Sequence, residues 1–313
     1  MIRKLASETW VWSFVAAALV WLATIAYTGG QGAGEILTAA LSFATFTIIV
    51  GLGQMMVITL GPGNVDLSIP ATITLSGVVA MKVMDTTPGL MLLGILAALG
   101  VSMLVGLFNF ALIRLLRIPP IIATLSSSFL IMSTAISYGR GIRIKPPLPL
   151  SDFATLRYLG VPMVAVLVLL ISILIYLLLT RSIFGRNVSA VGQSLRAAWL
   201  GGVNVERTRF FTYVLSALLA GVCGILLSGF SGGAALNMGE EFLLASIAVV
   251  VIGGTSVAGG RANVPGVWGA ALFMYLLVTM LNTFGAGAGI RLIMTGLIII
   301  AVIVAAGGDK QQR

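Results

Sequence analysis

Long apolar runs alternate with short polar connections along nearly the whole chain. The runs are continuous and about 20 residues long, the length that an α-helix needs to cross a bilayer, and they lack the alternation of a membrane β-barrel. We therefore predict an all-α polytopic membrane protein, a single membrane domain over residues 1–313 with about ten transmembrane helices. The predicted spans are residues 10–28, 36–60, 69–84, 89–113, 121–138, 160–180, 210–230, 242–258, 266–285 and 288–306.

Composition supports this class and excludes others. Hydrophobic residues make up 59% of the chain and charged residues 9%, whereas soluble domains carry about 25% charged residues. The net charge of +9 is spread over the connections between spans and forms no single basic face, so we expect no nucleic-acid partner. The single cysteine, Cys223, excludes an internal disulfide, and the absence of histidine excludes histidine-based catalysis and metal binding.

The distribution of cations predicts which side of the membrane each loop occupies. Ten spans place both termini on one side, and residues 181–209 hold five of the 18 Lys and Arg with Glu206 as the only acid. Because cationic loops translocate poorly, we place this loop and both termini in the cytoplasm. Residues 139–159, with four cations and three prolines, are then external. They are either a contact for an external partner or a solvated connector.

Three interruptions are predicted to break helices. They are residues 61–68 (GPGNVDLS), 117–121 (RIPPI) and 253–260 (GGTSVAGG), where proline and glycine disfavour a continuous helix. Backbone that leaves a helix at membrane depth must line a cavity or be buried in protein. The first and third breaks follow similar apolar runs in opposite halves of the chain, which is typical of an inverted repeat with a site at the midplane.

Few acids lie near the predicted spans. Asp66 either lines a pathway or locks the broken helix, or else it caps the helix that starts near Leu67, and these roles are compatible. Glu240 and Glu241 are assigned to a solvated external loop. No Gly-Lys-Ser/Thr motif for binding nucleotide phosphates occurs in the chain. If ATP drives this protein, we therefore expect it to bind to another chain.

A short helix is predicted inside the basic loop. Ser194 is a suitable N-cap and Gly201 a suitable stop. Between them, Leu195, Ala198 and Trp199 are spaced i, i+3 and i+4, which gives one apolar face. A helix this short is not stable alone in water. It therefore rests either in a groove of a partner protein or with Trp199 in the lipid interface.

Four ordered blocks resemble the permease subunit of bacterial ATP-binding-cassette importers of the ribose type, which take up monosaccharides and related small polyols. The blocks are Gly61–Ile69 (GPGNVDLSI), Arg117–Leu125 (RIPPIIATL), Phe184–Val203 (FGRNVSAVGQSLRAAWLGGV) and Ile247–Gly260 (IAVVVIGGTSVAGG). The resemblance covers essentially the whole chain.

The resemblance implies a multi-pass protein of the bacterial inner membrane and a set of partners. These are a second permease copy or paralogue, a periplasmic sugar-binding protein, and cytoplasmic ATP-binding-cassette ATPase subunits that carry ATP and Mg; this chain itself holds no cofactor. It also implies two groups of functional residues. The pathway group is Asn64, Asp66, Ser68, Gly253, Gly254 and Thr255, and the ATPase-coupling group is Gly192, Ser194, Leu195, Arg196, Ala198, Trp199 and Gly201.

The chain departs from the family pattern near these residues. Pro62 and Asn64 replace part of a plain Gly-Gly-Ile-Asp, Gln193 and Ser194 follow Gly192 where relatives have Gly-Asn, and Asn263 stands where many have Ser. These departures leave the sugar unspecified and allow either a homodimer or a heterodimer of permeases. The alternatives are a stand-alone secondary carrier or facilitator of small polar solutes, which needs no cytoplasmic motor, and an exporter or lipid-handling permease.

Overall fold

The computed structural model describes residues 9–141 and 144–285, together with positions 287, 289, 290, 293, 294, 296, 297 and 300. Within these residues the chain is mostly helical, and seven helices are long and apolar enough to cross a membrane. They are α2 (Thr9–Tyr27), α3 (Ala33–Thr59), α5 (Met91–Leu115), α6 (Pro120–Gly139), α8 (Met163–Arg181), α11 (Val205–Phe230) and α13 (Val264–Thr283). The prediction of an all-α polytopic membrane protein is confirmed.

Two further predicted spans are shorter apolar helices, α4 (Ile69–Met84) and α12 (Phe242–Ile252). At 1.5 Å per residue they are about 24 and 17 Å long, less than the ~30 Å hydrocarbon layer. Most of the tenth predicted span, 288–306, lies outside the described residues. The remaining elements are η1 (Pro88–Leu90), α7 (Leu148–Thr155), β1 (Arg157–Tyr158), β2 (Val161–Pro162), α9 (Ile183–Gln193) and α10 (Leu195–Leu200), with β1 and β2 forming a small antiparallel hairpin.

All three predicted helix breaks are present. Residues 60–68 separate α3 from α4, residues 116–119 separate α5 from α6, and residues 253–263 separate α12 from α13. In the first break Gly61 and Gly63 have φ of 118° and 78°, a left-handed conformation that glycine adopts without steric cost.

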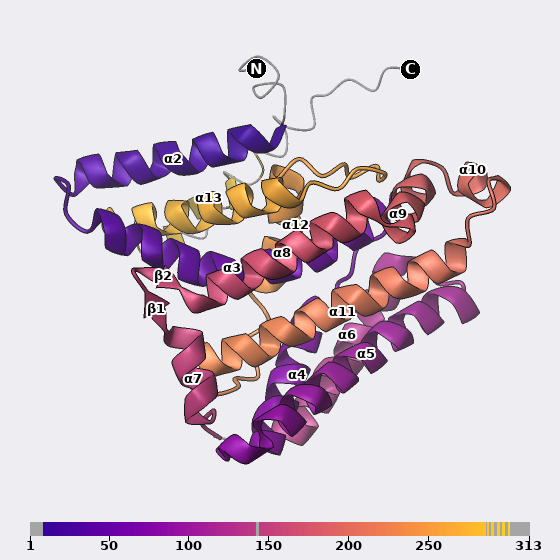
Figure 1. The fold of residues 1–313 in the computed structure, drawn as a ribbon, viewed down its shortest axis with the longest axis horizontal. Helices are drawn as coiled ribbons and strands as arrows, with labels where there is room; N and C mark the ends of the chain where they lie inside the picture. The colour runs from indigo at the N-terminus through magenta and orange to yellow at the C-terminus, as the bar shows by residue number, and fades with distance from the viewer. Residues whose placement is uncertain are drawn as a thin grey trace.

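The long helices run side by side between two ends of the molecule (Figure 1). At one end, which we call the α10 end, α5 and α8 finish, α6, α11 and α13 begin, and α9 and α10 protrude. The opposite end, which we call the α7 end, carries α7 and the β1–β2 hairpin.

Helices α3 and α11 are the most buried of the seven spans, and the others expose much of their surface. Small residues let the central helices approach closely, as is typical of membrane bundles. A Cβ atom at Gly53 of α3 would lie 3.1 Å from the Ser216 backbone of α11, and one at Gly106 of α5 would lie 2.7 Å from Val214 Cα. Helix α11 is therefore held against both α3 and α5 by backbone-level contacts.

The Gly106 contact predicts a pair of opposite stability changes within α5. Gly106→Ala should push α5 away from α11 and lower the melting temperature in detergent, with a cost of about 1–3 kcal/mol for overpacking. Gly100→Ala is the matched control, because a Cβ atom there meets nothing within 4 Å. It should leave the melting temperature unchanged or raise it, since alanine favours helix more than glycine does. Equal effects of the two changes would contradict this packing.

Candidate functional site

The break between α3 and α4 is organised around the carboxylate of Asp66, which is 2% exposed. One carboxylate oxygen accepts hydrogen bonds from the Ser68 backbone N–H (3.0 Å) and the Ser68 hydroxyl (2.6 Å). The other accepts from the Ser216 hydroxyl of α11 (3.3 Å). Asp66 thus fastens Ser68, the residue before α4, to α11. It does not cap α4 directly, since no side chain among the described residues bonds to the N–H groups of its first turn.

Polar side chains of α5 and α6 extend this arrangement. The Asn109 side-chain amide donates to the Ser68 hydroxyl oxygen (2.7 Å), and the Ser127 hydroxyl donates to the Asn109 amide oxygen. The Thr124 hydroxyl accepts from the Leu67 backbone N–H (3.0 Å). We call this set of hydrogen bonds, from Asp66 through to Ser127, the Asp66 network.

The side chains of α3 and α11 complete the support of the break. The Gln54 side-chain oxygen accepts from the Asp66 backbone N–H (3.2 Å), and the Tyr213 hydroxyl donates to the Asn64 side-chain oxygen (3.3 Å). Tyr213 is therefore buried inside the subunit, where it links α11 to the break.

The Asp66 network lies well inside the bundle. Asn109 precedes the last residue of α5 by six positions, and Ser216 follows the first residue of α11 by eleven. These positions are about 9 and 17 Å along their helices from the α10 end. Asn64, Asp66 and Ser68 are all buried, so none of these three predicted pathway side chains reaches the surface of this subunit.

The break between α12 and α13 is built mainly from backbone. Gly253 ends α12, and a Cβ atom there would lie 2.6 Å from the Gly266 carbonyl carbon, so this loop packs directly on the start of α13. Gly254 has a positive φ of 81°. The Thr255 hydroxyl is buried and has no hydrogen-bond partner among the described residues.

The two breaks meet each other and the end of α9 at a set of glycines, which we call the glycine junction. The Gly260 backbone N–H donates to the Thr59 carbonyl oxygen (2.9 Å). A Cβ atom at Gly192 would overlap both of those groups, and one at Gly259 would overlap Gly61. The ends of α3 and α9 and the 253–263 loop are therefore in backbone contact.

Helix α10 has the bounds predicted from the sequence. The Ser194 hydroxyl accepts from the Ala197 backbone N–H (3.2 Å), and Gly201 follows the last residue. The three residues of the expected apolar face differ in exposure, however. Leu195 and Trp199 are 45% and 61% exposed, whereas Ala198 is 5% exposed because it packs against the subunit's own core.

A groove of about 500 Å³ separates α10 from the start of α11. Leu195 and Trp199 line one side, and Glu206 and Arg209 of α11 line the other. The Arg196 guanidinium lies 5.8 Å from the centre of the Trp199 ring. The exposed side of α10 thus offers apolar and cationic groups next to an open groove.

Glu240 and Glu241 are exposed, as a solvated loop requires, but their loop does not lie at an end of the bundle as an external loop would. Gly239, just before them, packs so closely on α4 that a Cβ atom would overlap the Pro70 carbonyl oxygen. Since Pro70 is the second residue of α4, which begins inside the bundle, the two glutamates lie at the depth of that helix start.

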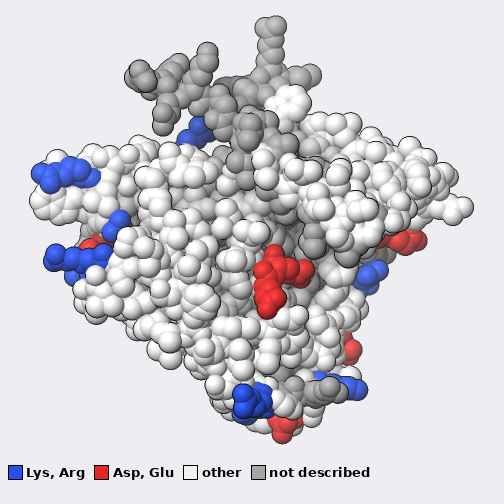
Figure 2. Space-filling model, turned by 180° about the vertical axis from the view of Figure 1, so that it is seen from behind, with Lys and Arg blue, Asp and Glu red and all other residues white. Residues whose placement is uncertain are grey.

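Contacts of Glu241 support this depth. Its carboxylate is close enough to Cys223 and Tyr275 to interact with them electrostatically. These residues lie seven and eight positions inside the last residues of α11 and α13, or about 10 and 12 Å along the helices. Both glutamates are exposed, and Figure 2 shows acidic side chains in the middle of a broad face that is otherwise uncharged.

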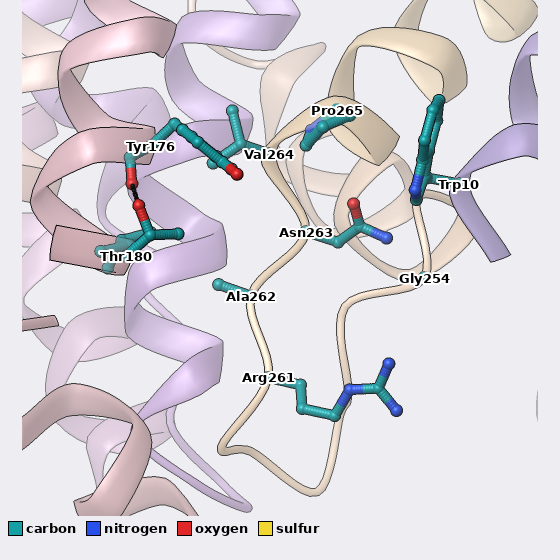
Figure 3. A pocket seen from close by; sticks show the side chains of 10 residues that line it. Trp10, Tyr176, Thr180, Gly254, Arg261, Ala262, Asn263, Val264 and Pro265 are labelled. Carbon is teal, nitrogen blue, oxygen red and sulfur yellow. Dashed lines mark hydrogen bonds between the residues drawn. The ribbon is translucent and has the colours of Figure 1, made fainter. Parts of the chain in front are cut away.

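A second hollow, of about 290 Å³, lies at the α10 end between α2 and α8 (Figure 3). Trp10 stands on one side and Tyr176 and Thr180 on the other. The rest of its described lining consists of Leu179, Gly254 and residues 261–265, which run into the start of α13. We call this hollow the Arg261 pocket after the charged residue among these lining residues.

Comparison with known proteins identifies the class. A family model described as the permease component of branched-chain amino acid transport systems matches residues 36–305. The chain belongs to this family of transport permeases.

Individual relatives are consistent with that membership. A probable ABC transporter permease of Sinorhizobium fredii is 33% identical over 272 residues, covering 85% of this chain and 79% of the relative. The autoinducer 2 import system permease LsrD of Photorhabdus laumondii is 31% identical over 264 residues, covering 82% of this chain and 78% of the relative. LsrD of Escherichia coli K12 is also 31% identical, with 82% and 79% covered. No solved structure matches the chain. The resemblance to ABC importer permeases is confirmed.

The Asp66 network predicts a specific loss of stability. Ser127→Ala should leave the buried Asn109 amide oxygen without its donor and cost about 1–3 kcal/mol. Ser126→Ala, at the neighbouring exposed position of α6, should have almost no effect. Thermal unfolding of both variants in the same detergent checks this, and a Ser127→Ala variant as stable as the wild type would rule out the bond.

Proposed function

We propose that this chain is the permease subunit of an ATP-driven importer of a monosaccharide or a related small polar solute. Its family and its ABC-permease relatives support this assignment, and two of these relatives are named for import of autoinducer 2. Because the sequence contains no phosphate-binding loop, ATP and Mg would be held by a partner ATPase.

The observation that carries the proposal is the exposed side of α10. A helix of six residues is not stable alone in water. This helix also exposes the apolar side chains of Leu195 and Trp199, which is unfavourable in water. A groove on a partner protein would bury both side chains, which is the helix-in-groove mode of recognition. The ATPase is the proposed partner. The proposed contacts with the ATPase are Ser194, Leu195, Arg196, Trp199 and Gly201. Ala198 anchors the helix from within, and Gly192 is buried at the glycine junction.

A movement of α10 by the ATPase would reach the membrane part of the subunit through the glycine junction. Gly192 lies in backbone contact with both helix breaks. A shift of α9 and α10 would therefore displace the end of α3 at Thr59 and the 253–263 loop directly. We propose that Asn64, Asp66, Ser68, Gly253, Gly254 and Thr255 shape the pathway wall from inside the subunit.

The face that carries Glu240 and Glu241 is the proposed wall of the pathway itself. Exposed carboxylates at membrane depth are costly against lipid and are found facing water-filled cavities or partners. A second permease, identical or paralogous, would cover this face and leave the solute a polar passage between the two subunits.

The orientation follows from charge. Arg114, Arg181, Arg186, Arg196 and Arg209 lie at or near the α10 end, which favours a cytoplasmic position for that end in the bacterial inner membrane and cytoplasmic termini. The α7 end would then face the periplasm, where a sugar-binding protein delivers the solute.

The α10 assignment predicts a selective loss of coupling. Trp199→Asp should abolish solute-stimulated ATPase activity and uptake by the reconstituted importer, because it places a charge in the ATPase groove, while leaving membrane insertion intact. Ile183→Asp is the matched control, since Ile183 is also exposed at the same end but lies outside α10. Uptake that persists in Trp199→Asp would favour a stand-alone carrier.

The pathway assignment predicts water access at Glu241. A Glu241→Cys variant in a Cys223→Ala background should react with a membrane-impermeant maleimide, because a thiol that faces water ionises. Leu174→Cys, exposed on α8, should stay unreactive in lipid. Protection of both cysteines in the assembled importer would contradict a water-filled passage at this face.

A further inference from the structure

Among the described residues that line it, the Arg261 pocket has one cationic residue and no acidic one. Arg261 is exposed and forms no ion pair with any described carboxylate. Asn263 stands beside it, and its side-chain oxygen accepts from the Gly266 backbone N–H (3.2 Å), so its amide hydrogens remain available as donors. The pocket is therefore suited to an anion that accepts hydrogen bonds.

Its position in the fold favours a membrane lipid as the source of that anion. Trp10 is the second residue of α2 and Thr180 is the second-last residue of α8, so the pocket lies at the level where helices leave the membrane. Trp10 and Tyr176 in its walls are the residue types that occupy the headgroup region of bilayers.

Apolar side chains are exposed on both helices that flank the pocket, among them Trp12 of α2 and Leu174 and Leu177 of α8. Helix α13 lies between these two helices, packed on α2 and joined to α8 by the hydrogen bond from the Trp268 indole to the Ser172 hydroxyl (2.8 Å). All three helices are among those long and apolar enough to cross a membrane.

We propose that the Arg261 pocket binds the headgroup of an anionic phospholipid, with Arg261 paired to its phosphate and Asn263 donating to a phosphate oxygen. Arginine is well suited to phosphate because its guanidinium offers several donors in one plane. This inference needs only that the chain spans a membrane, and it does not depend on the direction or the solute of transport.

A bound headgroup would act on the coupling region. Arg261 is next to Gly260 of the glycine junction, and its carbonyl oxygen accepts from the Ser256 backbone N–H (3.2 Å), which closes the loop on itself. A lipid paired with Arg261 would therefore anchor this loop to the membrane surface beside its backbone contact with the end of α9.

Lipid binding to the purified full-length permease tests the proposal. Native mass spectrometry would compare retention of phosphatidylglycerol with that of zwitterionic phosphatidylcholine in the wild type and in Arg261→Gln, Arg261→Lys and Arg186→Gln. We expect the wild type to prefer phosphatidylglycerol and Arg261→Gln to bind it about tenfold more weakly. Arg261→Lys keeps the positive charge and should retain most of the binding.

Arg186→Gln is the matched control, since Arg186 is exposed on α9 and does not line the pocket. It should bind phosphatidylglycerol like the wild type, and melting temperatures of all variants establish that they are folded. Equal retention of the two lipids, or equal weakening by Arg261→Gln and Arg186→Gln, would overturn the proposal. Displacement of phosphatidylglycerol by inorganic phosphate in excess would also overturn it, because the site would then bind free phosphate.

Discussion

The rest of this structure depends on how the backbone between α3 and α4 is satisfied inside the membrane. Lipid offers no hydrogen-bond partners, so a chain that leaves a helix at this depth needs them from neighbouring side chains. Asp66 and Gln54 supply acceptors for that backbone, and Thr124 adds another from α6. With the bonds from Asn109 and Ser216, four helices (α3, α5, α6 and α11) bond to this one irregular segment. These bonds fix where α4 begins.

The same segment is one side of the glycine junction, and this links stability to transport. Gly61 contacts the loop that follows α12, and Gly192 contacts both Gly61 and that loop. Because these contacts join backbone to backbone, they have no flexible side chain that could absorb a displacement. A packed interior of this kind transmits a shift rather than damping it. The end of α9 and the two helix breaks, to which we assign coupling and the pathway wall, are therefore mechanically continuous.

Most of the architecture could be predicted from the sequence, but the depth of every segment in the bundle could not. Proline and glycine located all three breaks, and Ser194 with Gly201 bounded α10, because these signals act within a few residues. The Asp66 network was missed, although Asn109, Ser127 and Ser216 stand as polar residues inside apolar spans and could have indicated it. Glu240 and Glu241 were misplaced because the position of a re-entrant loop is set by tertiary contact with Pro70, which no local pattern encodes. The division of α10 into a buried Ala198 and an exposed Trp199 is likewise a property of packing.

The shortness of α12 has a consequence for how the protein is made. Eleven residues cannot cross a bilayer, and two glutamates directly precede them, so this helix has no stable transmembrane position of its own. It reaches its place only where α3 and α13 already form a groove, with Gly51 lying against Val249 and Val267. We therefore expect biogenesis to have two stages. The long helices would insert first, and the chain between α11 and α13 would take its place afterwards, once a protein surface exists to receive it.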